Sequence, residues 1–395
     1  MPAVQGDARH TRVVVSAGLA FYLALGVGLG VTGPSLVPMR TDFGLPYATV
    51  ALVLVATGIG YLVGALVGGP LSDRYGRRRL MIGGTVGGCL GLAAVAVAPS
   101  FEMVFVAKVV TGLAYGVAEP TLTALLADAA REKSARAINI AQIAFAGGAL
   151  LAPLMVGGLL ASGLGWRPGF ALGAGLFVLL AGAFALIPYP PSTRHAAPVR
   201  DIVRTAFAPY VALLGLLLAL YVGLEIGFAG FSAAFLESQF GVERSAASAA
   251  VAIFWTGQVA GRMLGAWLVG RLDLFHVALL SAISATGFAA LASLAPVPAL
   301  ALVALFFVGV ASGSIFPNVM AIGLRRQSRN AGTVAGALFA LTSVGGLAFP
   351  PVIGAVSDAL DVRAGLLLVA LAMLPAVGLL LQAQALDRRH RRAGG

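Results

Sequence analysis

Charged residues are scarce in this sequence. Only 10% of its 395 residues are Asp, Glu, Lys or Arg, whereas 59% are hydrophobic, and the mean hydropathy is +0.96. Soluble domains carry roughly 25% charged residues, so this chain lacks the polar surface that a water-soluble protein of its length needs. We therefore expect a membrane protein.

Residues for metal, disulfide and nucleotide chemistry are scarce as well. Cys89 is the only cysteine, which excludes an intramolecular disulfide. The four histidines are scattered without the spacing of metal ligands, and the chain has no Gly-Lys-Ser/Thr phosphate loop. No Ser, His and Asp arrangement of a hydrolase is visible either. We therefore expect no enzymatic activity, no metal or organic cofactor and no use of ATP.

Long apolar runs, in contrast, fill most of the chain. A membrane-spanning helix needs about 20 mostly apolar residues, and the first run is too long for a typical cleaved signal peptide. The sequence predicts an all-α membrane protein with twelve transmembrane helices, arranged as an N-terminal six-helix bundle (1–188), a polar and proline-rich linker (189–207) and a C-terminal six-helix bundle (208–395). The expected spans are 13–38, 47–71, 80–98, 103–128, 137–162, 169–188, 208–236, 246–270, 274–294, 299–323, 331–357 and 364–384.

Basic residues favour one side of this arrangement. Of the 26 Lys and Arg residues, 20 fall on the side that holds both termini and 4 on the other side, while Lys108 and Arg262 lie inside spans. Basic residues collect in cytoplasmic loops, so we expect a multi-pass protein of the plasma (inner) membrane with both termini in the cytoplasm. The net charge of +11 then reflects contact with anionic lipid headgroups rather than with nucleic acid.

The chain also repeats itself. A shift of 197 residues, about half of the chain, brings matching residues together in three pairs of spans. Six is an even number, so both halves start on the same side and the repeat is parallel, as in transporters whose halves rock about a central site. Glycines four residues apart predict faces along which helices approach closely and slide. The matching pairs are Gly60–Gly257, Gly64–Gly261, Gly68–Gly265, Leu71–Leu268, Arg74–Arg271, Gly112–Gly309, Ala114–Ala311, Gly116–Gly313, Pro120–Pro317, Pro153–Pro350 and Gly157–Gly354.

The turn between the second and third spans reads GGPLSDRYGRR (68–78). It resembles the signature Gly-x-Leu-x-Asp-Arg-x-Gly-Arg-Arg of the major facilitator superfamily of transporters. The resemblance implies that Asp73 caps the start of the span at 331–357, and that Arg74 or Arg77 pairs with Asp128 as a releasable latch. The matching residues are Gly69, Leu71, Asp73, Arg74, Gly76, Arg77 and Arg78.

Other stretches resemble particular branches of this superfamily. GALLAPLMVGG (148–158), with Gly148 and Pro153, is similar to the fifth-helix motif of exporters. YVGLEIGF (221–228) and FWTGQVAGR (254–262) are similar to segments of the fucose/glucose:proton symporters. The first resemblance implies export and the second implies uptake.

Four charges lie inside the expected spans, at Lys108, Glu119, Glu225 and Arg262. Each costs about 2.5–3.5 kcal/mol at mid-membrane on insertion scales, so each needs a reason. Glu119 and Glu225 are candidates for a carboxyl group that takes up and releases a proton. The alternative is structural, with ion pairs between helices such as one between Glu225 and Arg262.

Other polar residues share helix faces with these charges. Lys108, Tyr115 and Glu119 follow an i, i+7, i+11 pattern on one helix face. The expected substrate-cavity residues are Lys108, Tyr115, Tyr221, Gln258, Arg262, Ser314 and Asn318. Residues that could serve either the cavity or helix packing are Tyr22, Thr32, Thr57, Tyr61, Asn139, Gln142, Thr342 and Ser343.

These features predict a secondary transporter that moves one small organic solute by alternating access and draws energy from a proton gradient. Export is favoured narrowly, because the chain is poor in the Asn, Gln and Trp residues that bind sugars. One alternative is a proton symporter for sugar-type uptake. An alternative of another class is a non-transporting membrane receptor or scaffold, which would show no solute flux.

Overall fold

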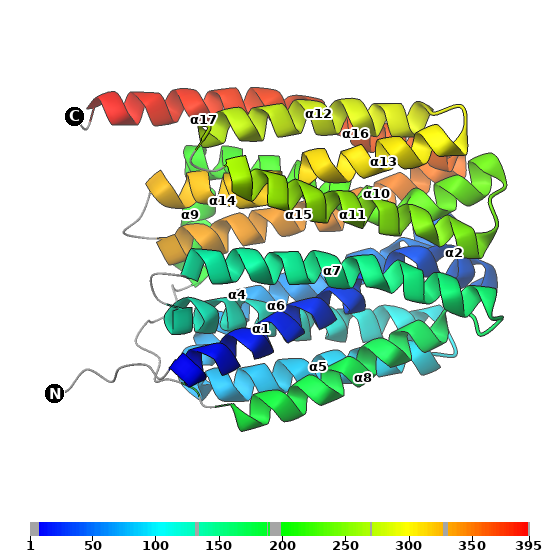
Figure 1. Ribbon diagram of the computed structural model, residues 1–395, viewed down its shortest axis with the longest axis horizontal. Helices are drawn as coiled ribbons and strands as arrows, with labels where there is room; N and C mark the ends of the chain where they lie inside the picture. Colours follow the sequence, from blue (N-terminus) through cyan, green and yellow to red (C-terminus); the bar gives the residue numbers. More distant parts are fainter. Residues whose placement is uncertain are drawn as a thin grey trace.

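A computed structural model describes residues 8–130, 134–187, 189, 199–268, 271–326 and 331–393. Over these residues the chain forms seventeen α-helices. The longest of them run along the long axis of the molecule (Figure 1). The all-α class predicted from the sequence is confirmed.

The first six predicted spans correspond to eight helices, because two spans are divided. Pro34 has no N–H to donate to the carbonyl of Gly30, so α1 ends there and α2 begins at Thr32. A second division, at Ala51, separates a four-residue helix from α4. The helices are α1 (Ala8–Gly30), α2 (Thr32–Phe43), α3 (Tyr47–Val50), α4 (Leu52–Tyr75), α5 (Arg77–Val97), α6 (Phe101–Ala130), α7 (Ser134–Ala161) and α8 (Arg167–Leu186).

Two of the last six predicted spans are also divided at prolines. Pro317 and Pro375 cannot donate to the carbonyls four residues before them, and α13 and α16 end close to those carbonyls. A short helix, α9, lies within the segment 189–207, which the sequence predicts only as a linker. The helices are α9 (Val199–Ala206), α10 (Pro209–Phe240), α11 (Arg244–Leu268), α12 (Leu274–Leu294), α13 (Pro298–Gly313), α14 (Ile315–Arg326), α15 (Ala331–Ala359), α16 (Val362–Ala372) and α17 (Leu374–Ala393).

Eleven helical segments within the described residues are long and apolar enough to cross a membrane. They match eleven of the twelve predicted spans. The remaining predicted span, 246–270, corresponds to α11, which has 25 residues but carries Gln258 and Arg262 in its interior, and these two side chains lower its hydropathy. The predicted count of twelve is therefore consistent with the structure.

The helices form two halves that lie against each other (Figure 1). Helices α1–α8 pack on one side and α10–α17 on the other, with α7 beside α11 at the boundary. At the same boundary α2 contacts α10, and α15 contacts α3 and α4. The start of α1 and the end of α17 lie at one end of the bundle, which we name the terminal end, as an even number of spans requires. The other is the opposite end.

Glycines allow backbones to cross closely inside the first half. A Cβ atom on Gly60 would touch the carbonyl oxygen of Val109, and one on Gly112 would touch that of Thr57. Only glycine fits at such crossings, so α4 and α6 are in direct backbone contact. This pair of helices forms the central support of the half.

The second half repeats this crossing with the same offset of 197 residues. Gly257 lies against the carbonyl oxygen of Phe306, and Gly309 lies against that of Phe254. Helix α11 therefore crosses α13 as α4 crosses α6. Both crossings lie within a half, so these glycines join helices inside each half rather than across the boundary.

Two arginines that directly follow loops at the opposite end repeat as well, and we name them the loop arginines. Each arginine lies in the first turn of the last span of its half, in α8 or α16, and ties the ends of two other spans together. Both make one hydrogen bond to a side chain at the end of the first span and one to a backbone carbonyl after the third. The contacts are Arg167 to Asp42 (3.1 Å) and to the Ala98 carbonyl (3.3 Å), and Arg363 to Gln239 (3.2 Å) and to the Ala295 carbonyl (3.3 Å).

One carboxylate fastens the two halves at the opposite end. Asp358, near the end of α15, accepts hydrogen bonds from the backbone N–H groups of Tyr47 (2.8 Å) and Ala48 (2.7 Å). These are first-turn groups of α3, which have no partner within their own helix and attract negative charge. One turn earlier, Gly354 lies against the backbone of Ala48. The two halves are therefore closed against each other at this end.

Gly309→Ala should destabilise the protein. Its methyl group would meet the backbone carbonyl oxygen of Phe254 and lie 2.8 Å from the backbone nitrogen of Gln258. Overpacking of this kind costs about 1–3 kcal/mol. The measurement is the thermal unfolding temperature of the purified protein in detergent. Gly287→Ala is the matched control, since a Cβ there meets no described atom of another helix within 4 Å. Equal unfolding temperatures for both variants would contradict the prediction.

Asp358→Ala should loosen the opposite end. Loss of a helix N-cap costs about 1 kcal/mol, which corresponds to a shift of about fivefold between closed and open arrangements. The measurement is the distance between spin labels on Ser162→Cys and Leu360→Cys in a Cys89→Ser background. We expect a larger population at long distance.

Asp361→Ala is the control for this experiment, because Asp361 caps α16 within its own half through the N–H of Ala364 (2.7 Å). It should leave the distance distribution unchanged. If the two aspartate variants give the same distribution, the cap on α3 does not hold the halves together.

Candidate functional site

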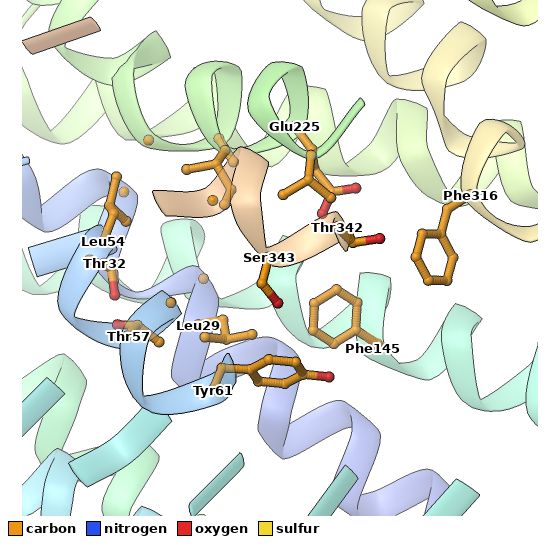
Figure 2. A pocket seen from close by; sticks show the side chains of 18 of the residues that line it. Leu29, Thr32, Leu54, Thr57, Tyr61, Phe145, Glu225, Phe316, Thr342 and Ser343 are labelled. Atoms are coloured by element: carbon orange, nitrogen blue, oxygen red, sulfur yellow. The ribbon is translucent and has the colours of Figure 1, made fainter. Parts of the chain in front are cut away.

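A cavity of about 270 Å³ lies between the two halves. Helices α1, α2, α4, α6 and α7 line it from one side, and α10, α11, α14 and α15 line it from the other. A site shared by two halves is the arrangement that alternating access requires. Figure 2 shows Leu29, Thr57, Tyr61 and Phe145 of the first half and Glu225, Phe316, Thr342 and Ser343 of the second half around it.

All four charges of the spans line this cavity. Lys108 and Glu119 come from α6, Glu225 from α10 and Arg262 from α11, and Tyr221 joins them. Each half thus contributes one acidic and one basic side chain to the same space. The cavity is where these charges avoid contact with lipid.

Glu119 is positioned by three helices. The hydroxyl of Tyr61 on α4 donates a hydrogen bond to its Oε2 atom (2.9 Å). One turn along α6, the hydroxyl of Thr123 donates to the Glu119 carbonyl (2.9 Å) and pairs with the hydroxyl of Tyr22 on α1 (2.7 Å). The carboxyl group is therefore fixed at the wall of the cavity.

Glu225 has a similar environment in the second half. The hydroxyl of Tyr221, one turn earlier on α10, donates a hydrogen bond to its Oε2 atom. The amide of Gln258 on α11 donates to the same oxygen (3.1 Å). Gln258 itself is fully buried and is not among the described residues that line the cavity, although the sequence predicts it there. Each half therefore holds one carboxyl group by a tyrosine hydroxyl.

Arg262 crosses the boundary between the halves. Its guanidinium donates to the backbone carbonyl of Gln142 on α7 (2.6 Å) and lies 3.4 Å from the side-chain oxygen of the same residue. Within the part of the chain that the structure describes, no ion pair joins Arg262 to Glu225. The alternative in which Arg262 serves only as the partner of Glu225 is not supported by this geometry.

Lys108 lies in the wall formed by α6, where α2 begins. Its Nζ atom donates to the hydroxyl of Thr32 (3.0 Å) and lies 5.7 Å from the centre of the Phe170 ring. The side chain is only 1% exposed. It is therefore a buried ammonium group at the edge of the cavity.

Three more expected cavity residues, in addition to Gln258, lie elsewhere. Tyr115 stacks on Phe177 of α8 (5.2 Å between ring centres), inside the first half. Ser314 pairs with Ser281 of α12 (2.8 Å), and Asn318 is buried within the second half. None of the three is among the described residues that line the cavity. Residues on one helix face point their side chains in the same direction. The neighbouring element that each side chain meets, however, changes along the length of the helix.

Further polar candidates do line the cavity, and so do aromatic residues that the sequence did not indicate. Phe145 of α7 and Trp255 of α11 meet across the boundary (5.7 Å between ring centres). An aromatic residue in an apolar span has the same sequence signature in a core, in a cavity or against lipid, so no signal could have found them. The polar candidates are Thr32, Thr57, Tyr61, Gln142, Thr342 and Ser343, and the further aromatic residues are Phe316 and Phe339.

The turn between α4 and α5 is described in part. Gly69 and Leu71 lie in the last turns of α4, which ends before Gly76, whose φ of +83° suits glycine. Arg78 donates to the Ala185 carbonyl of α8 (2.7 Å), Arg74 lies over the ring of Tyr75 (5.2 Å), and Arg77 is buried. The side chains of Asp73 and Asp128 and the residues 327–330 lie outside the described part. The latch implied for them stays a prediction.

The fifth-helix motif takes part in packing. A Cβ on Gly148 would touch the carbonyl oxygen of Leu23, so α7 and α1 are in backbone contact there. Pro153 lies inside α7 without ending the helix. Gly157, near the opposite end, faces Ser245 and Ser248 of α11 across the boundary.

Comparison with known proteins agrees with this architecture. The sequence model of the Major Facilitator Superfamily matches residues 18–350. The 3-(3-hydroxy-phenyl)propionate transporter of Escherichia coli (strain K12) is 32% identical over 213 residues, which are 53% of this chain and 52% of that protein. The chain thus matches about half the length of this relative. The probable nitrate/nitrite transporter NarK2 of Mycobacterium tuberculosis is 29% identical over 349 residues, 83% of this chain and 85% of that protein.

A solved structure shares the fold. A bacterial homolog to the human lysosomal transporter Spinster, in an inward-facing and occupied conformation, superposes with a TM-score of 0.78 at 16% identity, over 96% of this chain and 98% of that chain. The relatives and the structural neighbour are transporters rather than enzymes, as expected. The chain belongs to the Major Facilitator Superfamily.

Proposed function

We propose that this protein is a proton-coupled transporter that exports a small organic solute by alternating access. The observation that carries the proposal is the pair Glu119 and Glu225. One carboxyl group from each half lines the same cavity, and each accepts a hydrogen bond from a tyrosine hydroxyl. Ionisable groups inside membrane spans mark proton relays and substrate paths.

A carboxyl group carries a proton across a membrane when it faces the two sides in turn. Glu119 moves with the first half and Glu225 with the second, so rocking of the halves changes the access of both. Arg262 reaches between them, and its hydrogen bonds to Gln142 break when α7 and α11 separate. A freed guanidinium then competes with the proton for a carboxylate, which links proton release to the movement.

Export is supported by the GALLAPLMVGG stretch (148–158) and by the lining of the cavity. Gln142 is the only Asn or Gln side chain among the described residues that line it. This favours a solute less polar than a sugar. The second candidate is sugar-type uptake with protons. It is favoured by the stretches at 221–228 and 254–262, which supply Tyr221, Glu225 and Arg262 to the cavity.

We further propose that residues 1–188 and 208–395 move as two bundles joined by the linker 189–207. The excess of basic residues at the terminal end supports a plasma (inner) membrane orientation with both termini in the cytoplasm. Helix α9 in the linker carries Arg200 and Arg204, which suit contact with anionic headgroups.

The relatives suggest which compounds to test first. One is named for an aromatic acid and the other for nitrate and nitrite, all small solutes. A panel built around small organic acids, neutral drugs and sugars therefore covers the proposal and its main alternative.

Glu225→Gln should remove proton coupling. The variant keeps the size of the side chain but cannot exchange a proton, so we expect accumulation driven by a pH gradient to fall at least tenfold. Solute exchange without a gradient should continue. The measurement is flux in proteoliposomes with and without an imposed pH gradient. Glu102→Gln is the control, because Glu102 is an exposed carboxylate at the start of α6. Unchanged gradient-driven accumulation in Glu225→Gln would refute coupling through this residue.

The direction of transport can be tested with membrane vesicles of both orientations. Export predicts proton-driven accumulation of a panel compound in inside-out vesicles, whereas the sugar-type alternative predicts it in right-side-out vesicles. A receptor or scaffold predicts no flux in either. The decisive measurement is initial uptake with and without a proton ionophore.

A further inference from the structure

The ammonium group of Lys108 has little compensation from the protein. Within the described part of the chain its Nζ atom makes a single hydrogen bond, to the neutral hydroxyl of Thr32. An ammonium group has three donors. No carboxylate oxygen of the described residues lies within 4.0 Å of it. Two donors therefore have no partner among the described residues, although Lys108 and Thr32 are each only 1% exposed where they line the cavity.

The two carboxyl groups of the cavity do not serve this lysine. Glu119 follows it by eleven residues on α6, about 16 Å along the helix axis. Its carboxylate is engaged by Tyr61, and that of Glu225 is engaged by Tyr221 and Gln258. A buried charge without a partner is costly. An anion that enters the cavity from outside the protein would supply this partner.

We propose that the cavity binds a small organic carboxylate with an apolar, ring-bearing body, and that Lys108 and Thr32 hold its carboxylate. This inference rests on the proposed transport function and names the class of its substrate. Charge-assisted hydrogen bonds from an ammonium group to a carboxylate are among the strong ones in proteins. Binding thus supplies hydrogen-bond partners to the ammonium group of Lys108 and to the carboxylate of the substrate at the same time.

The rest of the lining fits the body of such a molecule. Phe145 and Trp255 form an edge-to-face pair across the boundary, and Phe316 and Phe339 are tilted against each other (5.7 Å between ring centres). Flat rings pack favourably against such aromatic surfaces. A sugar would leave hydroxyl groups unpaired against these walls, and an inorganic anion would leave them unfilled. The volume of about 270 Å³ admits a small molecule only.

Aromatic rings from both halves meet around this body. Phe145 belongs to the first half and Trp255 to the second, whereas Lys108 belongs to the first half alone. The carboxylate is then held by one half while the ring touches both. Substrate binding in this pose couples the two halves through the ring.

The test measures equilibrium binding to the full-length protein in detergent by titration calorimetry, without any proton gradient. The probes are benzoate, phenylacetate and 3-phenylpropanoate, each with its neutral amide, and nitrate alone. We expect at least one carboxylate to bind at least tenfold more tightly than its amide, and nitrate at the same concentration not to displace it. This comparison uses the unmodified protein and does not depend on any variant folding.

Variants then assign the site. Lys108→Met should weaken carboxylate binding about 10- to 100-fold, as expected for loss of a charged hydrogen bond, and leave amide binding unchanged. Lys108→Arg should retain most of the preference for the carboxylate. Thr111→Val is the matched control, because Thr111 is buried on the same helix and donates to its own helix backbone at Ala107 (2.8 Å).

Several results would overturn the inference. They are equal affinity for carboxylates and amides, no binding of any of the three carboxylates, displacement by nitrate, and full carboxylate binding in a folded Lys108→Met variant. These results are separate from the test of coupling. Loss of gradient-driven flux in Glu225→Gln together with charge-independent binding would uphold the proposed function and reject this site. Carboxylate binding through Lys108 without gradient-driven flux would uphold this site and reject the proposed function.

Discussion

A charge inside a hydrocarbon layer must be kept away from lipid, in the interior of the bundle or at a cavity, and this requirement organises the molecule. The four charges of the spans converge on one cavity, where side chains and backbone of both halves can meet them. Outside the spans, basic residues gather at the terminal end. At the opposite end, the loop arginines and Asp358 each find a partner. The positions of the charges thus mark the cavity and the two ends of the bundle.

The scaffold repeats, but the site does not. Glycine crossings and loop arginines recur with a shift of about 197 residues, because both halves solve the same packing problem. The charged cavity residues break the repeat, since each matches an uncharged residue in the other half. The charges that line the cavity are therefore not part of the internal repeat. The matching pairs are Lys108–Leu305, Glu119–Phe316, Glu225–Gly28 and Arg262–Ala65.

Much of the fold could be predicted from the sequence, because long apolar runs have few ways to satisfy their backbone in a membrane. The division of spans at Pro34 and Pro317 was not predicted, although its cause, a missing N–H, is local. The cap that Asp358 forms on α3 could not be predicted from the sequence. It depends on which helix ends meet across the boundary, and no periodicity encodes that.

The site could be predicted where chemistry made residues conspicuous. Lys108, Glu119, Glu225 and Arg262 stand out in apolar spans, and the structure places them all at the cavity. Tyr115 shares a face of α6 with Lys108 and Glu119. Its side chain nevertheless packs against Phe177 of α8 and not against the cavity. The aromatic lining gave no signal, because burial against a cavity and burial in a core require the same residue types.

The balance of charges within each half has a consequence for how the protein is made. One basic and one acidic residue occupy the spans of each half, so six helices enter the membrane with no net charge in its interior. The glycine crossing and the loop arginine of each half also find their partners within that half. We therefore expect that the first six helices can assemble while the ribosome is still translating the rest. The cavity between the halves would then form only when the two halves dock.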